Sequence, residues 1–131
     1  MEEEQKNKTI MLVDDDKFLL EMYAKKFANS GFDVMSATSA RGAIDQLVNN
    51  SNVDIFLFDI IMPEMDGLEL LEKVRVENLA PKAIKIVLSN QGQQIEIDKA
   101  EELGIDGYII KALHTPSEVV TKVNQIIANK K

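Results

Sequence analysis

The 131-residue sequence contains no cysteine and no tryptophan, only one histidine (His114) and only three prolines. The lack of cysteine excludes a disulfide framework and a thiolate metal site, and one histidine cannot form an imidazole metal site by itself. No apolar run is long enough to span a bilayer, and residues 1–8 are acidic and polar where a signal peptide needs a basic start followed by an apolar run. We therefore expect a cytoplasmic protein without membrane insertion.

Basic residues are in the minority, because 15 Lys+Arg oppose 22 Asp+Glu and leave a net charge of −7. A nucleic-acid-binding surface needs a basic patch, so this balance argues against direct binding of nucleic acid. A chain of this length with 45% hydrophobic residues fits one globular domain. We expect residues 1–7 to form a flexible acidic leader and residues 8–131 to form the domain.

Apolar runs alternate along the chain with segments of helical periodicity. Runs without polar alternation are typical of strands buried on both faces, and helices with one apolar stripe cover such a sheet. The predicted strands are residues 9–13, 32–37, 55–58, 84–88 and 108–110. The predicted helices are residues 17–29, about 40–48, 68–74, about 96–103 and 116–127. This order predicts an α/β fold, a three-layer sandwich around a parallel sheet.

Helix starts carry their own signals. Asp16 is expected to cap the first helix, and Thr38 or Ser39 the second. Residues 115–118 form a capping box with proline at the first helical position of the last helix.

Polar side chains stand where the predicted strands end: Asp14, Asp15, Asp59, Ser89 and Lys111. Because the carboxyl ends of parallel strands lie at one edge of a sheet, we expect these side chains to converge on one cleft. Three carboxylates with one ammonium are under-neutralised, and a ligand set made only of oxygens suits Mg²⁺. Asp59 would then attack phosphorus, while Ser89 and Lys111 bind phosphoryl oxygens, and the product would be an aspartyl phosphate.

From about residue 8 to residue 129 the chain resembles the receiver domains of two-component response regulators. The resemblance rests on MLVDD at residues 11–15, DIIMPEMDG at 59–67, VLS at 87–89, GIDGY at 104–108, and Lys111. It implies a flavodoxin-like (βα)5 sandwich with a parallel five-stranded sheet of order 2-1-3-4-5.

The resemblance also implies roles for individual residues. Asp59 would be the phosphoacceptor, assisted by Ser89 and Lys111. Mg²⁺ would be held by Asp14, Asp15, Asp59 and the backbone carbonyl of Ile61. Ser89 and Tyr108 would form a switch, in preference to Tyr108 being an ordinary edge-strand aromatic residue.

The same resemblance implies partners. The phosphoryl group would come from a sensor histidine kinase or a histidine phosphotransfer protein. Phosphorylation would change the surface formed by the fourth helix, fifth strand and fifth helix, and so control binding of an unknown output protein. The chain would then be a signalling domain, with no enzymatic activity beyond its own phosphorylation and dephosphorylation.

One departure from the family pattern concerns the residue after Lys111. Receivers usually have proline there in a cis peptide bond, whereas this chain has Ala112. A cis bond to a residue other than proline costs about 2.5–4 kcal/mol, so either this bond is cis under strain or the loop is rebuilt around a trans bond. We expect Lys111 to reach the site, and His114 to be a loop residue.

Two other interpretations compete. A receiver-like module could bind partners without phosphorylation; the complete acidic set opposes this interpretation, and Ala112 leaves it open. Alternatively, a haloacid-dehalogenase-like phosphatase would use Asp14 as its nucleophile, because residues 14–16 contain an Asp-x-Asp motif. Phe18 stands where that family needs a small or β-branched residue, and its later acidic pair is missing.

Overall fold

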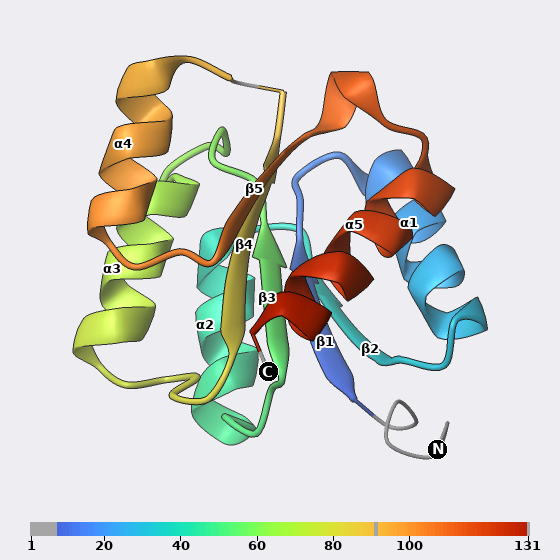
Figure 1. Ribbon diagram of the computed structural model, residues 1–131. Coiled ribbons are helices and arrows are strands. Elements are labelled where there is room, and N and C mark those ends of the chain that lie inside the picture. The colour runs from blue at the N-terminus through green and yellow to red at the C-terminus, as the bar shows by residue number, and fades with distance from the viewer. Residues whose placement is uncertain (1–7, 91, 131) are drawn as a thin grey trace.

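In a computed structural model that describes residues 8–90 and 92–130, five strands alternate with five α-helices (Figure 1). The strands are β1 (Thr9–Val13), β2 (Asp33–Ala37), β3 (Ile55–Phe58), β4 (Ile84–Ser89) and β5 (Gly107–Ile110). The helices are α1 (Lys17–Asn29), α2 (Ala40–Asn49), α3 (Gly67–Val76), α4 (Gln94–Glu102) and α5 (Pro116–Asn129). A 3₁₀ turn, Lys111–Leu113, connects β5 to α5.

All strand pairs are parallel, and the order is β2-β1-β3-β4-β5, which confirms the predicted flavodoxin-like topology. The register aligns the carboxyl ends of the strands, because Val13 pairs with Ala37 on one side and with Phe58 on the other. The backbone N–H of Asp59 donates to the Val13 carbonyl over 3.0 Å. Asp14 and Asp59 therefore leave two neighbouring strands at the same edge of the sheet.

Helices cover both faces of the sheet: α1 and α5 lie on one side, and α2, α3 and α4 on the other (Figure 1). Alternate residues of β1 serve the two layers, with Ile10 and Leu12 packed under α1 and α5 and Met11 and Val13 packed under the other helices. Each fully buried side chain of this size stabilises the fold by about 1.5–3 kcal/mol. Burial on two faces explains why these strands show no polar alternation.

The predicted caps at the helix starts are present. The Asp16 carboxylate accepts a hydrogen bond from the Leu19 N–H at the start of α1, and the Ser39 hydroxyl, one of the two candidates, accepts one from the Gly42 N–H at the start of α2. Thr115 and Glu118 form the capping box of α5. These bonds satisfy N–H groups that have no partner inside the helix.

The start of α4 differs from the prediction, because the helix begins at Gln94 rather than at about residue 96. The N-cap residue Gln93 forms no side-chain cap hydrogen bond, so the sequence carries no start signal at this point. The leader predicted for residues 1–7 lies outside the described residues. Within the described ranges, no helix has the length and apolar character needed to cross a membrane.

Candidate functional site

A pocket of about 270 Å³ opens where the sheet ends at its carboxyl edge. The residues predicted for the site line it together: Asp14, Asp15, Asp59, Ile61, Ser89 and Lys111. Three further lining residues were not predicted, namely Asp16, Leu19 and Asn90. They follow β1 or β4 directly or start α1, so proximity to the strand ends is the signal that could have found them.

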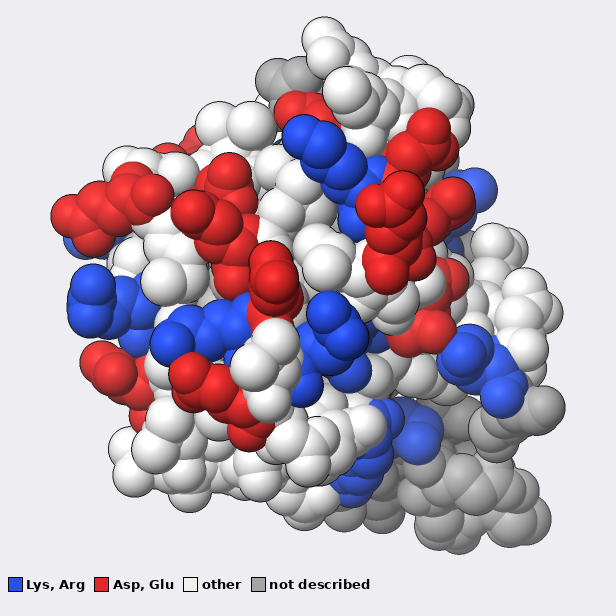
Figure 2. Space-filling view, turned by 90° about the vertical axis from the view of Figure 1, so that its left-hand side faces the viewer, with Lys and Arg blue, Asp and Glu red and all other residues white. Residues whose placement is uncertain are grey.

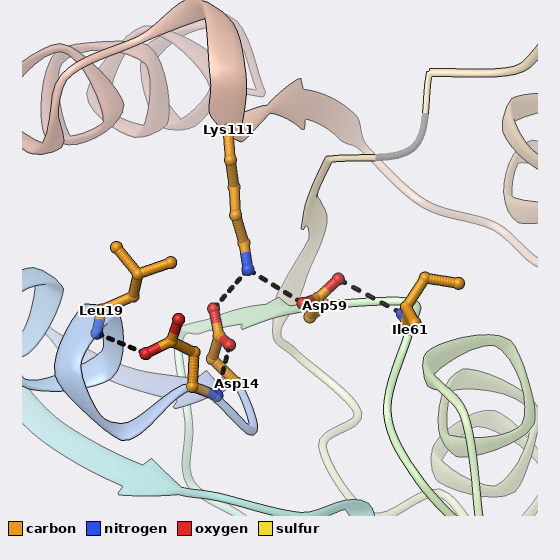
Figure 3. Close-up of polar contacts among 6 residues, drawn as sticks. Asp14, Leu19, Asp59, Ile61 and Lys111 are labelled. Carbon is orange, nitrogen blue, oxygen red and sulfur yellow. Dashed lines mark hydrogen bonds and ion pairs between the residues drawn. The ribbon is translucent and has the colours of Figure 1, made fainter.

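The ammonium group of Lys111 joins two buried carboxylates in this pocket (Figure 3). Its Nζ donates to Asp14 Oδ2 over 2.6 Å and to Asp59 Oδ2 over 2.9 Å. These distances are typical of charge-assisted hydrogen bonds, which are shorter and stronger than bonds between neutral groups. Burial further strengthens the attraction between the ammonium group and the two carboxylates. Lys111 therefore fixes the ends of β1 and β3 relative to β5.

Backbone N–H groups hold the other oxygen of each carboxylate. Asp14 Oδ1 accepts from the Asp16 N–H over 2.9 Å, and Asp59 Oδ1 accepts from the Ile61 N–H over 3.3 Å (Figure 3). Each carboxylate is thus held from both sides. The side chain of Asp15, in contrast, is exposed at the mouth of the pocket.

The site carries an excess of negative charge. Carboxylate oxygens of Asp14, Asp15 and Asp59 lie within 4.8 Å of one another. Burial raises the pKa of Asp14, and the hydrogen bonds from Lys111 and from the Asp16 N–H offset this only in part. Burial alone would lower the pKa of Lys111, but hydrogen bonds to Asp14 and Asp59 outweigh it and the pKa is raised. Both pKa shifts favour the protonated, more positive form of the side chain, which reduces the excess of negative charge. The carboxylate oxygens, with no sulfur or imidazole among them, fit a hard divalent cation such as Mg²⁺.

The loop after Lys111 is rebuilt around a trans bond, since residues 8–90 and 92–130 contain no cis peptide bond. The chain turns through the 3₁₀ segment Lys111–Leu113, and the His114 N–H donates to the Lys111 carbonyl over 3.2 Å. Lys111 reaches Asp14 and Asp59 by this path. His114 lies in the loop before α5, as expected, with its Nδ1 3.8 Å from a Glu118 carboxylate oxygen.

The two residues predicted to form a switch lie at different depths. Ser89 is fully buried at the end of β4 and lines the pocket. Tyr108 is half-buried on the neighbouring strand β5, does not line the pocket, and packs against the core on the α2–α4 side. Burial raises the pKa of its phenol, and the negative charges of Glu96 and Asp59 raise it further.

Three exposed apolar side chains belong to chain segments that contribute to the pocket: Phe18 (71% exposed), Ile61 (53%) and Leu113 (67%). Ile61 lines the pocket, Phe18 adjoins the lining residue Leu19, and Leu113 ends the turn that begins at Lys111. We call this set the apolar rim.

Comparison with known proteins places this site in a family. The family model of the response regulator receiver domain matches residues 10–124. The chemotaxis protein CheY homolog of Campylobacter jejuni is 30% identical over 119 residues, which cover 90% of this chain and 91% of that protein. The probable transcriptional regulator ycf29 of Porphyra purpurea is 34% identical over 118 residues, which cover 90% of this chain but 56% of that protein.

A solved structure agrees with the sequence matches. The CheY-like receiver domain protein of Methanospirillum hungatei superposes with a TM-score of 0.83 at 28% identity, over 95% of this chain and 96% of that one. Fold, acidic pocket and sequence similarity lead to one conclusion. The chain belongs to the response regulator receiver domain family, a signalling domain of two-component systems.

Proposed function

We propose that Asp59 accepts a phosphoryl group from the phosphohistidine of a sensor histidine kinase or a histidine phosphotransfer protein, in a Mg²⁺-dependent reaction. The observation that carries this proposal is the arrangement of Asp14 and Asp59, which are paired by one ammonium group beside the exposed carboxylate of Asp15. The pocket around them is open and large enough for a phosphoryl group.

The chemistry follows from these positions. A carboxylate oxygen of Asp59 attacks phosphorus, a P–O bond forms, and the P–N bond to the donor imidazole breaks with its electron pair returning to nitrogen. Mg²⁺ held by Asp14, Asp15, Asp59 and the Ile61 carbonyl would neutralise charge on the phosphoryl oxygens. Lys111 and Ser89, which line the same pocket, would contact the remaining oxygens.

Phosphorylation would then alter the surface of α4, β5 and α5. The phosphoryl group adds about one to two negative charges beside the buried Ser89 hydroxyl, and Tyr108 lies on the adjacent strand. On α4, Ile95, Lys99 and Glu102 are exposed to a partner. Figure 2 shows the side of the molecule that holds α3 and α4, where acidic and basic side chains lie next to one another, so an output protein that binds α4 would meet charges of both signs.

The proposal is tested by the intact mass of the protein after incubation with a small phosphodonor. We expect the mass of one phosphoryl group to be added when Mg²⁺ is present, and no addition when a chelator removes divalent cations. A protein that gains no mass with Mg²⁺ would instead support the interpretation as a phosphorylation-independent binding module.

The apolar rim leads to a separate prediction about the protein donor. Replacing Phe18 by alanine is expected to slow phosphoryl transfer from a phosphorylated histidine phosphotransfer protein by at least about tenfold, because exposed aromatic anchors dominate many interfaces. Transfer from a small phosphodonor should be unchanged, since the ring lies outside the pocket.

The matched control for Phe18 is Val76→Ala. Val76 is an equally exposed apolar residue at the far end of α3, away from the pocket, and its removal should slow neither reaction. Equal loss of rate with the small phosphodonor in the Phe18→Ala protein would show damage to the pocket rather than to a docking surface.

A further inference from the structure

A buried tyrosine lies close to the site without taking part in the chemistry proposed above. Tyr23 is on the inner face of α1, only 4% exposed, within the core between the sheet and helices α1 and α5. Side chains on a helix incline toward its N-terminus, and α1 starts at the edge of the sheet that holds the pocket. The Tyr23 side chain is therefore inclined toward the edge of the sheet that holds the pocket.

The Tyr23 hydroxyl is polar and needs a partner. Among the described residues no hydrogen bond to it is found, yet its oxygen is not one of the fully enclosed side-chain atoms that lack a partner, so it borders space that water can enter. Burial raises the pKa of Tyr23, and the positive charge of Lys111 and the negative charges of Asp14 and Asp59 act on it in opposite directions. A buried hydroxyl left without a hydrogen bond costs about 1–3 kcal/mol.

Tyr23 and Asp14 both line a small cavity of about 10 Å³. Its lining contains two residues with polar side chains, Tyr23 and Asp14, and five leucine or valine residues from α1, β1, β3 and β4. A volume of roughly 10–15 Å³ is what one water molecule needs, together with at least two polar partners. The cavity reaches the lower end of this volume, and two of its lining residues carry polar side chains.

We propose that one water molecule in this cavity joins the Tyr23 hydroxyl to Asp14, so that Tyr23 is a positioning residue for the Asp14–Lys111 pair. Asp14 is held by Lys111 on one oxygen and by the Asp16 N–H on the other, and the water adds a third hydrogen bond from within the core. The effect on Mg²⁺ binding and phosphorylation rests on the proposed function, whereas the link between Tyr23 and Asp14 exists without metal or phosphoryl group.

The first test is the Mg²⁺ affinity of the Tyr23→Phe protein, measured by calorimetry. Loss of the hydroxyl is expected to weaken Mg²⁺ binding about tenfold, because groups that orient a metal ligand typically change affinity by about 10- to 100-fold. The matched control is Leu20→Met, which disturbs the packing of the same cavity and removes no polar group. Its Mg²⁺ affinity should stay within about twofold of wild type, since volume-conserving apolar exchanges are tolerated best.

The second test is a double-mutant cycle of Tyr23→Phe with Asp14→Asn, followed by urea unfolding without Mg²⁺ or phosphodonor. We expect the shifts in the urea midpoint not to add, because each variant removes one end of the same link. In the control cycle, Tyr23→Phe is combined with Asp54→Asn. Asp54 lies at the opposite edge of the sheet, where it bonds the Thr9 N–H and Lys82, and these shifts should add.

Unchanged Mg²⁺ affinity in the Tyr23→Phe protein, or an additive cycle with Asp14→Asn, would overturn the inference. A wild-type protein that gains no phosphoryl group would overturn the proposed function alone. The cycle separates the two, because it measures the link between Tyr23 and Asp14 in the free protein.

Discussion

The Asp59→Asn protein is expected to gain no phosphoryl group under conditions in which the wild type is fully modified. The amide keeps the shape of the carboxylate but has no charged oxygen to attack phosphorus, and Lys111 loses one of its two anionic partners. Intact mass after incubation with Mg²⁺ and a small phosphodonor measures the result directly. Because the nucleophile itself is removed, the loss should be complete rather than partial.

The control for Asp59 is Asp45→Asn, the same exchange at an exposed position on α2, which should be phosphorylated like the wild type. Persistence of the adduct in the Asp59→Asn protein would place the acceptor elsewhere. If the adduct then disappeared in Asp14→Asn, the phosphatase interpretation with Asp14 as nucleophile would gain support.

The Gly67→Ala protein is expected to lose about 3 kcal/mol of its free energy of unfolding, at the upper end of the usual range for overpacking. A Cβ at this position would lie 2.1 Å from the Asp59 carbonyl oxygen and 2.7 Å from the Ile60 Cα. Both obstacles are backbone atoms, and the Gly67 N–H donates to the Ile60 carbonyl over 2.7 Å, so α3 cannot move away without breaking that bond. Urea unfolding followed by circular dichroism gives the change.

The same exchange at Gly42, also in the first turn of a helix, is the matched control. There the added Cβ meets the Ser39 hydroxyl at 3.2 Å, a side-chain atom that can shift. Alanine favours a helix over glycine by about 1 kcal/mol, so stability should stay within about that amount of wild type. A Gly67→Ala protein as stable as Gly42→Ala would show that the start of α3 adjusts its position freely.

The central sheet and the pocket could be predicted from the sequence because their signals are local. Apolar runs such as residues 9–13 and 55–58 suit strands buried on both faces. Parallel pairing of these strands then brings the residues that follow them to one edge of the sheet. Side-chain chemistry at those ends was sufficient to predict an acidic site.

Other features depend on tertiary structure and could not be predicted. Phe18 belongs to the apolar set of α1, yet it lies two residues from the buried Leu20 and so on a different side of the helix. The path after Lys111 was open because Ala112 does not restrict the backbone as proline would. Periodicity places Tyr23 in the core, but it does not show how close the hydroxyl comes to Asp14.

The separation of the core into two layers has a consequence for how such a protein diversifies. Side chains beneath α1 and those beneath α4 belong to different clusters and meet only through the strands. Substitutions on the α1 side therefore leave the packing of α4 untouched, and the reverse also holds. If α1 binds the phosphodonor and α4 the output protein, as the proposed function requires, the two specificities could evolve independently around one acidic pocket.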